Sequence, residues 1–217
     1  MLSQSVEDYL KTIYKLQSRG EEAPVSTGEI AESMEVSAAS VSNMIKRLTD
    51  MDLVEYESYK GVTLTETGIK IALEVIRHHR LLELYLREVM DYPWDKVHEE
   101  AEHLEHHISE DFEEKLEEML GNPTHDPHGD PIPTRSGTIA ETATRPLASV
   151  DSGESVIIRR VSDTDPELLT HLEDIGLLPA NEVAVVEKSK FNGPLTIRTN
   201  GDDHVVGYEI ACKVFVK

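Results

Sequence analysis

The spacing of apolar residues changes along this chain, and that change constrains the fold more than any other feature. In most of the first 120 residues, apolar side chains recur with the period of a helix, as at Val6, Leu10 and Ile13. After about residue 153, short runs such as ESVIIRRV and NEVAVVEKS are separated by turn residues, which is typical of strands. The sequence therefore predicts a mainly α chain with a C-terminal all-β domain, a small β-barrel.

The first 65 residues predict a winged helix-turn-helix. A helix over 3–17 precedes a second helix that begins at STGEIAESM, where Ser26 and Glu29 have the spacing of a capping box. A third helix is expected from Ser40 to Met51, after a tight turn. The following LVEYESYKGVTLT alternates apolar and polar residues around Lys60-Gly61 and predicts a β-hairpin, the wing.

The middle of the chain predicts two longer helices and then a loop. The first helix is expected to be capped by Thr65 or Thr67 and to end near Met90, and the second to run from Trp94 to Leu120. GNPTHDPHGDPIPTRSG closes this part, and strands are expected in ESVIIRRV, NEVAVVEKS, PLTIRTN and GYEIACKVFVK. The expected domains are 1–73 (winged helix-turn-helix), 74–134 (helical), 135–152 (linker) and 153–217 (β-barrel).

The charge of the chain bears on its partners. There are 42 acidic and 21 basic residues, a formal net charge of −21, which repels nucleic acid and anionic membranes at long range. Such acidity also suits solubility in a salty cytoplasm. The one cysteine, Cys212, excludes an internal disulfide, and the sequence lacks both a signal peptide at its start and an apolar stretch that could span a membrane. We expect a cytoplasmic protein with no membrane partner.

The stretch HEEAEHLEHH, residues 98–107, concentrates histidine and glutamate. On one helix of about 100° per residue, a stripe of metal-ligand types falls beside a buried stripe of Val97, Ala101, Leu104 and Ile108. That ligand stripe comprises His98, Glu102, Glu105 and His106. The remaining members, Glu100, His103 and His107, are expected to face solvent. The preceding helix adds His79 and Glu83, which are one turn apart on one face.

Carboxylates that border a core need a nearby positive charge, because burial and like charges both disfavour the ionised form. A divalent cation held between the two helices would supply that charge. The alternatives are a solvated charged face and a di-iron bundle, which needs Glu-x-x-His on two helices of four. The sequence shows no Ser/His/Asp arrangement, HExxH or Gly-rich phosphate loop, so we do not expect an enzyme.

Motifs along nearly the whole chain resemble one family. They are VEDYLKTIY, SAASVSNMIKRL, GVTLTETG, RHHRLLELYL, VHEEAEHLEHHIS and HGDPIP, with HLEDIGLLPANEVAVVE near the C-terminus. Together they are similar to the diphtheria-toxin-repressor family of metal-dependent transcriptional repressors. The resemblance implies a winged helix, a helical metal-binding and dimerisation domain, and a C-terminal SH3-like barrel related to small ferrous-transport accessory domains.

The resemblance also implies two metal positions per subunit. Four residues stand where the family binds its activating metal: Asp8, Glu102, Glu105 and His106. A second position comprises His79, Glu83 and His98, completed from the SH3-like domain by Asp163, with Asp165 the second choice. Manganese-sensing members use hard oxygen ligands where Asp8 and Glu102 stand, whereas iron-sensing members use methionine and cysteine. Lys11 stands where the manganese branch has a further glutamate, which argues against a close binuclear site there.

Two windows free of acidic residues coincide with the parts that a winged helix lays on DNA. They are 36–49, the recognition helix, and 58–65, the wing. Short polar side chains suit phosphates or base edges, and cationic ones neutralise phosphates. The candidate DNA-contacting residues are Ser37, Ala39, Ser40, Ser42, Asn43, Lys46, Arg47 and Lys60, and we expect at least one of the serines to be an ordinary helix cap.

These observations predict a homodimeric repressor that binds palindromic operator DNA when loaded with Mn2+ and controls metal-uptake genes. Metal would join Asp8, on the first helix, to the ligands of the dimerisation segment and so fix the spacing of the two recognition helices. An Fe2+-dependent repressor on the same scaffold is the close alternative. A metal-storage or di-iron protein and a winged-helix regulator that answers an organic ligand are the others.

Overall fold

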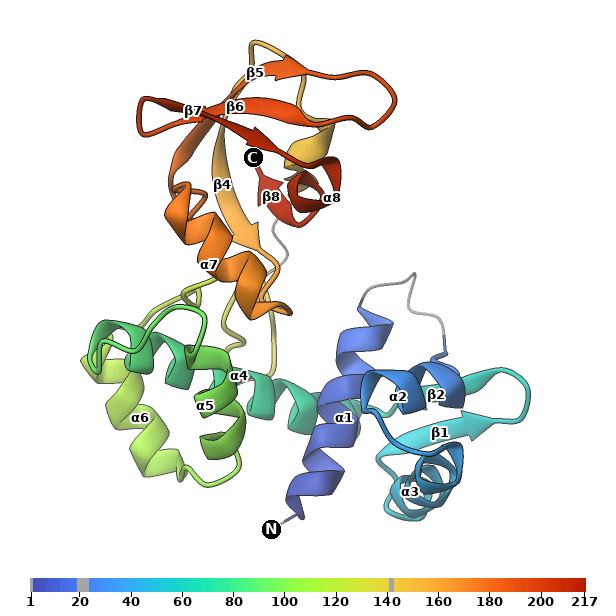
Figure 1. The fold of residues 1–217 in the computed structure, drawn as a ribbon. Coiled ribbons are helices and arrows are strands. Elements are labelled where there is room, and N and C mark those ends of the chain that lie inside the picture. The colour runs from blue at the N-terminus through green and yellow to red at the C-terminus, as the bar shows by residue number, and fades with distance from the viewer. Residues whose placement is uncertain (1, 19–23, 141–142) are drawn as a thin grey trace. The chain divides into compact units, whose positions relative to one another are not determined.

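The computed structural model describes residues 2–18, 24–140 and 143–217 (Figure 1). Residues 141 and 142, within the predicted linker, therefore lie outside the described residues. The chain divides into two compact units. Unit 1 comprises Met1–His78, Glu105–Ile108 and Pro133–Ile139, and unit 2 comprises His79–Leu104, Ser109–Ile132 and Ala140–Lys217.

Unit 1 begins with α1 (Gln4–Gln17), and α2 (Thr27–Ser33) and α3 (Ala38–Asp50) form the predicted helix-turn-helix after it. The capping box is confirmed, because Ser26 Oγ accepts a hydrogen bond from Glu29 N at 3.1 Å and the Glu29 carboxylate accepts one from Ser26 N at 2.9 Å. One apolar core joins the three helices and includes Leu10, Ile30 and Leu48. This burial fixes which face of α3 remains exposed.

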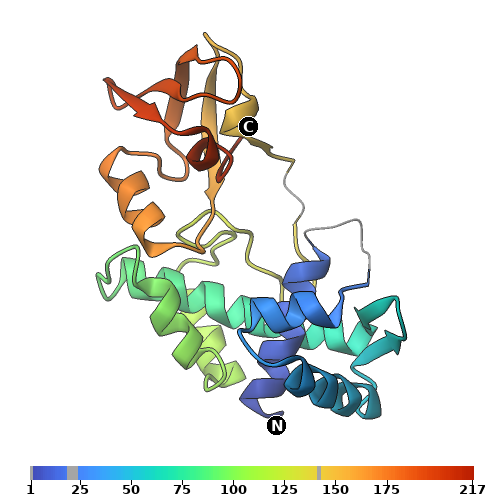
Figure 2. The ribbon, with the colours of Figure 1, turned by 45° about the vertical axis from the view of Figure 1, so that its right-hand side comes forward.

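The wing is confirmed as an antiparallel hairpin, β1 (Val54–Glu57) and β2 (Gly61–Leu64), which lies beside α3 (Figures 1 and 2). Gly61 has a φ of 128°, and a Cβ there would lie 2.5 Å from the carbonyl oxygen of Val25. Only glycine tolerates both that backbone and that approach. The Lys60-Gly61 turn therefore follows from a steric requirement as well as from the apolar pattern.

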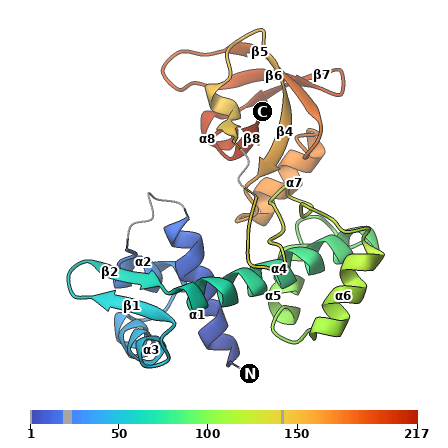
Figure 3. The ribbon, with the colours of Figure 1, turned by 180° about the vertical axis from the view of Figure 1, so that it is seen from behind.

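The middle of the chain contains α4 (Glu66–Glu88), α5 (Val97–Leu104) and α6 (Glu110–Met119), the last two side by side in unit 2 (Figure 3). The prediction of one helix from Trp94 to Leu120 is wrong. The chain turns after Leu104, and the Ser109 side chain accepts a hydrogen bond from Phe112 N and so begins a new helix. Within the described residues, no helix is both long and apolar enough to cross a membrane.

That turn also corrects the predicted stripe. Glu105 and His106 lie beyond the end of α5, so their approach to other ligands does not come from helical phase. Leu104, expected in the core, is 37% exposed. His103 and His107 are exposed as expected, and Glu100 is partly buried.

The C-terminal part of unit 2 is a six-stranded antiparallel sheet in the order β3-β8-β4-β5-β6-β7. The expected strands β4 (Ser155–Val161), β5 (Glu182–Lys188) and β6 (Leu195–Thr199) are confirmed. The sheet packs on a core that also includes Trp94. The remaining elements are β3 (Arg145–Pro146), η1 (Leu147–Ser149), α7 (Pro166–Asp174), β7 (Asp202–Val206), α8 (Tyr208–Ala211) and β8 (Val214–Val216).

Two C-terminal segments differ from expectation. The run expected to be one strand, GYEIACKVFVK, contains the short helix α8 and a strand only at Val214–Val216. The strand β7 was not predicted, because its sequence DDHVV begins with acidic residues that disfavour strands. It forms at the edge of the sheet, where its side chains are mostly exposed and only one neighbouring strand is needed.

Candidate metal centres and DNA-binding surface

The first candidate metal centre lies in unit 1, where α1 meets the turn after α5. His106 Nε2 is 2.8 Å from Asp8 Oδ1 and 3.3 Å from Glu105 Oε1. The side chains of His106 and Glu105 are buried. Three of the four residues predicted for the activating site are thus brought together.

Glu7, which the sequence reasoning missed, orients this histidine. Its Oε2 lies 2.6 Å from His106 Nδ1, so Nδ1–H can donate to the carboxylate and leave the Nε2 lone pair facing Asp8 and Glu105. Among the described residues, His106 Nε2 is buried without a hydrogen bond of good geometry. A histidine that donates through one nitrogen to a carboxylate and offers the other to anionic oxygens has the arrangement of a metal ligand. A divalent cation fits this donor set.

Lys11 compensates part of the charge in the same cluster. Its Nζ lies 2.8 Å from both carboxylate oxygens of Glu105, and both side chains are buried. Three carboxylates (Glu7, Asp8 and Glu105) and one ammonium leave two net negative charges around the His106 ring. A single divalent ion would balance that charge.

The second candidate metal centre is a triangle of donor atoms in unit 2. His79 Nε2, Glu83 Oε1 and His98 Nδ1 are separated by 2.9 Å, 3.0 Å and 3.0 Å. Adjacent donors around a six-coordinate ion with bonds of about 2.1 Å are about 3 Å apart. His79 and Glu83 lie one turn apart on α4, and His98 comes from α5. The donor spacing therefore fits an octahedral divalent ion.

The electrostatics of Glu83 agree with a cation-binding role. Burial alone would raise the pKa of its carboxyl, but His79, His128 and His98 outweigh burial and hold the pKa of Glu83 well below its usual value. Glu83 is therefore an anion in the interior of unit 2. An anionic, oxygen-donating ligand is what hard divalent ions prefer.

Asp163 extends this second centre, whereas Asp165 has a structural role. Asp163 Oδ2 is 3.9 Å from His98 Nδ1, so its carboxylate borders the triangle. Asp165 Oδ1 instead accepts hydrogen bonds from Glu167 N and Leu168 N and caps α7. The geometry favours Asp163 over Asp165 as a donor from the C-terminal domain.

Glu102 is placed in unit 2, whereas Asp8, Glu105 and His106 belong to unit 1. Its Oε1 is 3.8 Å from His79 Nδ1 and 3.7 Å from His98 Nε2. Within unit 2, Glu102 therefore faces the outer nitrogens of two histidines of the second centre. Its carboxylate can orient those rings through their N–H groups.

His128 is a further buried residue that the sequence reasoning missed. It lies in the DPHGDP segment, its side chain is fully buried, and its Nδ1 is 3.9 Å from Glu83 Oε2. Residues in an irregular loop have no period to reveal which way they point, so helical phase could not find it. The signal in the sequence that could have pointed to His128 is the presence of a histidine between a proline and a glycine in this loop.

The candidate DNA-binding surface is exposed, as expected from the winged-helix outline. Ser37 is the N-cap of α3, and its Oγ accepts a hydrogen bond from Ser40 N at 3.2 Å. Ser42 Oγ donates to the carbonyl oxygen of Ala38. Lys60 pairs with Glu57 across the wing at 2.7 Å, which offsets part of its charge. The exposed candidates on and beside α3 are Ser37, Ala39, Ser40, Ser42, Asn43, Lys46 and Arg47.

A winged helix together with histidine and carboxylate clusters defines a metal-responsive DNA-binding protein. Three family models match: the iron dependent repressor N-terminal DNA binding domain at 1–62, the iron dependent repressor metal binding and dimerisation domain at 65–134, and the FeoA domain at 145–217. The chain belongs to the iron-dependent repressor family, which includes the diphtheria toxin repressor, and the predicted family and fold class are confirmed. This family consists of transcriptional repressors, not enzymes.

Relatives of both metal types match along the chain. The iron-dependent repressor IdeR of Mycobacterium leprae is 34% identical over 100% of this chain and 98% of its own, and the diphtheria toxin repressor of Corynebacterium diphtheriae is 30% identical over 93% and 92%. A solved manganese-dependent transcriptional repressor in complex with manganese is 35% identical, with a TM-score of 0.89 over 98% of this chain and 99% of that one. The similar proteins thus include both iron-dependent and manganese-dependent repressors, so the comparisons do not distinguish between the two metals.

Proposed function

We propose that the protein is a cytoplasmic, manganese-dependent repressor that binds palindromic operator DNA when metal-loaded and controls metal-uptake genes. One observation carries the choice of metal. Within the described residues, every potential donor in the candidate metal clusters is a carboxylate oxygen or an imidazole nitrogen, and none is sulfur. Hard oxygen donors with imidazole suit Mn2+, whereas thiolate and thioether donors favour softer ions.

The proposed activating centre uses Asp8, Glu105 and His106, which form the unit 1 cluster, together with Glu102 as a fourth ligand. The second centre uses His79, Glu83, His98 and Asp163. The proposed domains are 1–73 for DNA binding, 74–134 for metal binding and dimerisation, 135–152 as linker and 153–217 as the SH3-like domain.

Activation would act through the residues that α1 and the turn after α5 contribute. Without metal, the carboxylates of Glu7, Asp8 and Glu105 repel one another around one imidazole. A bound divalent ion supplies the compensating charge. With the ion bound, Asp8 would be held against Glu105 and His106. The ion would therefore tie α1 of the winged helix to the turn that follows α5. Metal binding favours the DNA-competent state only to the extent that this state binds the metal more tightly than the DNA-incompetent state does.

Exposed apolar side chains in unit 2 support a dimer. They lie at the end of α4, at the end of α5 and on α6, within the range of the dimerisation-domain model. These residues are Val89, Met90, Leu104, Phe112 and Met119. A two-fold dimer presents two recognition helices in inverted orientation, and the matching operator is a palindrome.

Fe2+ is the second candidate metal. The curated relatives that match along nearly the whole chain include the iron-dependent repressor of Mycobacterium leprae. Intrinsic affinity also rises from Mn2+ to Fe2+ for most donor sets. The ligands argue for Mn2+ because the iron-sensing pattern has methionine and cysteine where Asp8 and Glu102 stand.

The test is DNA binding as a function of free Mn2+, Fe2+ and Zn2+ at fixed ionic strength, with Fe2+ kept anaerobic. We expect activation by Mn2+ at micromolar free ion, abolished in His106→Ala and in Glu102→Ala while the dimer stays folded. The matched controls His103→Ala and His107→Ala remove exposed histidines and should change little. Equal losses in both pairs of variants would contradict the ligand assignment, and activation by Fe2+ alone would favour the iron-dependent alternative.

A further inference from the structure

His128 is a buried histidine whose ring makes no hydrogen bond within the described part of the chain. Its exposed fraction is 0%, and among the described residues neither Nδ1 nor Nε2 makes a hydrogen bond. Burying an imidazole with both nitrogens unsatisfied costs free energy unless something else contacts them. The ring is also held in place, because it stacks on Trp94 with 5.3 Å between centroids.

The backbone around His128 fixes the ring against the sheet. His128 N donates to Asp126 Oδ1 at 2.8 Å, and the His128 carbonyl oxygen accepts from Val161 N at 2.9 Å. Gly129 has a φ of 90°, and a Cβ there would lie 1.9 Å from the carbonyl oxygen of Arg159. The loop therefore packs closely against the end of β4, and β4 ends at Val161, two residues before Asp163. This contact positions His128 and Asp163 together.

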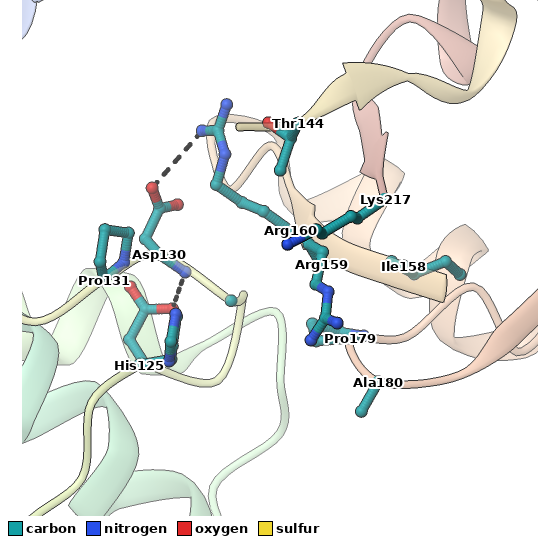
Figure 4. Close-up of a pocket in the computed structure, with 12 residues that line it drawn as sticks. His125, Asp130, Pro131, Thr144, Ile158, Arg159, Arg160, Pro179, Ala180 and Lys217 are labelled. Atoms are coloured by element: carbon teal, nitrogen blue, oxygen red, sulfur yellow. Dashed lines mark hydrogen bonds and ion pairs between the residues drawn. The ribbon is translucent and has the colours of Figure 1, made fainter. Parts of the chain in front are cut away.

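A cavity of about 540 Å³ lies beside the same loop but does not explain His128. Its lining includes Asp130 and Arg160, whose side chains face each other in Figure 4. His128, Glu83 and Asp163 are not among the residues that line it. The unsatisfied nitrogens instead lie near a different group of side chains, which includes Glu83 and Asp163.

That group shares Glu83 with the second candidate metal centre. Glu83 Oε1 faces His79 and His98, whereas Glu83 Oε2 is buried without a hydrogen bond among the described residues and lies 3.9 Å from His128 Nδ1. Glu83, His128 and Asp163 each offer one potential ligand atom, and these three atoms all lie within 4.8 Å of one another. A gap of 3.9 Å is too wide for a hydrogen bond, yet two donors on one metal ion are separated by about 3 to 4 Å.

We propose that Glu83, His128 and Asp163 form an additional divalent-cation position beside His79 and His98, with Glu83 bridging two ions through its two oxygens. Carboxylates commonly bridge ions about 3.5 to 4 Å apart in two-metal sites. The inference rests on the second centre of the proposed function and adds a ligand and an ion to it.

The test counts Mn2+ bound by the full-length protein. In a His106→Ala background, which disables the unit 1 cluster, equilibrium dialysis with metal analysis should give two Mn2+ per subunit. His128→Phe in the same background keeps a ring to stack on Trp94 and should reduce the count to one. His125→Ala removes an exposed histidine of the same loop and should leave two.

Electron paramagnetic resonance supplies a second readout. An isolated Mn2+ ion gives a six-line signal, whereas two Mn2+ ions bridged by Glu83 would couple magnetically and broaden it. His128→Phe should leave one ion and so restore the sharp six-line signal. One bound Mn2+ with an uncoupled signal in the His106→Ala protein would overturn the proposal, whatever the variants at 128 do. An unchanged count in His128→Phe would also overturn it and would point to a charged His128 paired with Glu83. Because metal counting needs no DNA, failure of the regulatory function would appear separately, as intact metal binding without DNA binding.

Discussion

Glu7 decides which nitrogen of His106 can face a cation. Its Oε2 lies 2.6 Å from Nδ1, while Nε2 faces Asp8 and Glu105. Loss of such a carboxylate partner usually weakens metal binding about 10- to 100-fold. We expect Glu7→Gln to weaken Mn2+ binding at the unit 1 cluster by that factor, measured by calorimetric titration.

Glu32→Gln, an exposed glutamate on α2, is the control and should bind Mn2+ as the wild type does. If Glu7→Gln and Glu32→Gln have the same Mn2+ affinity, then Glu7 does not orient His106.

Lys11 is the second residue whose role the structure defines. Removing one member of a buried ion pair leaves the other charge uncompensated and costs about 3 to 5 kcal/mol. We expect Lys11→Met to lower the free energy of unfolding by that amount in chelator, because Glu105 loses its buried partner. The loss should shrink with saturating Mn2+, since a bound ion compensates the same carboxylate.

Urea unfolding with and without Mn2+ measures both quantities, and Lys70→Met, at an exposed position, serves as control. A loss of stability that is equal with and without metal would show that Lys11 and the ion do not share Glu105.

At the scale of elements, the sequence shows which residue types could bind a metal, but it predicts only part of their arrangement in space. His79 and Glu83 lie on one continuous helix, so their spacing predicted their common face. Glu105 and His106 were assigned to a helical stripe, yet a Ser109 cap starts a new helix and leaves them on a turn. Local capping competed with apolar periodicity, and the periodic pattern alone did not reveal the break.

The recognition helix α3 and the wing carry the next prediction. Arg47 is exposed on α3, so Arg47→Ala should weaken binding to every DNA sequence and reduce the salt dependence by about one phosphate contact per subunit. Asn43→Ala should instead cost roughly 1–3 kcal/mol of discrimination at one base pair per half-site. Anisotropy titrations at several salt concentrations separate the two effects.

Lys60→Ala is expected to change the salt dependence less than Arg47→Ala, because Lys60 is paired with Glu57. Loss of sequence preference in Arg47→Ala, with an unchanged salt slope, would contradict the assignment of phosphate and base contacts.

At the scale of the whole molecule, the order of domains follows from the sequence. The switch from helical to strand periodicity located the β domain, although α8 and the edge strand β7 were not anticipated. His128 could not be placed from the sequence, because its burial depends on Trp94 and on β4, which lie far from it along the chain. Such long-range packing leaves no local pattern.

The net charge of −21 makes DNA binding conditional for the whole chain. Long-range repulsion opposes association, whereas windows 36–49 and 58–65, which cover most of α3 and the tip of the wing with β2, contain no acidic residue. Bound divalent ions reduce the repulsion and, in the proposed mechanism, also tie α1 to its metal-binding partners. Metal-free protein should therefore bind even nonspecific DNA poorly.

The most direct test of the account is selection of bound sequences from a random double-stranded DNA pool, with the full-length protein in Mn2+ and in chelator. We expect enrichment of a palindromic sequence in Mn2+, no enrichment in chelator, and none for His106→Ala in either condition. Enrichment of the same sequence in chelator, or equal enrichment by His106→Ala, would contradict the claim that metal held by these carboxylates and histidines switches the protein onto DNA.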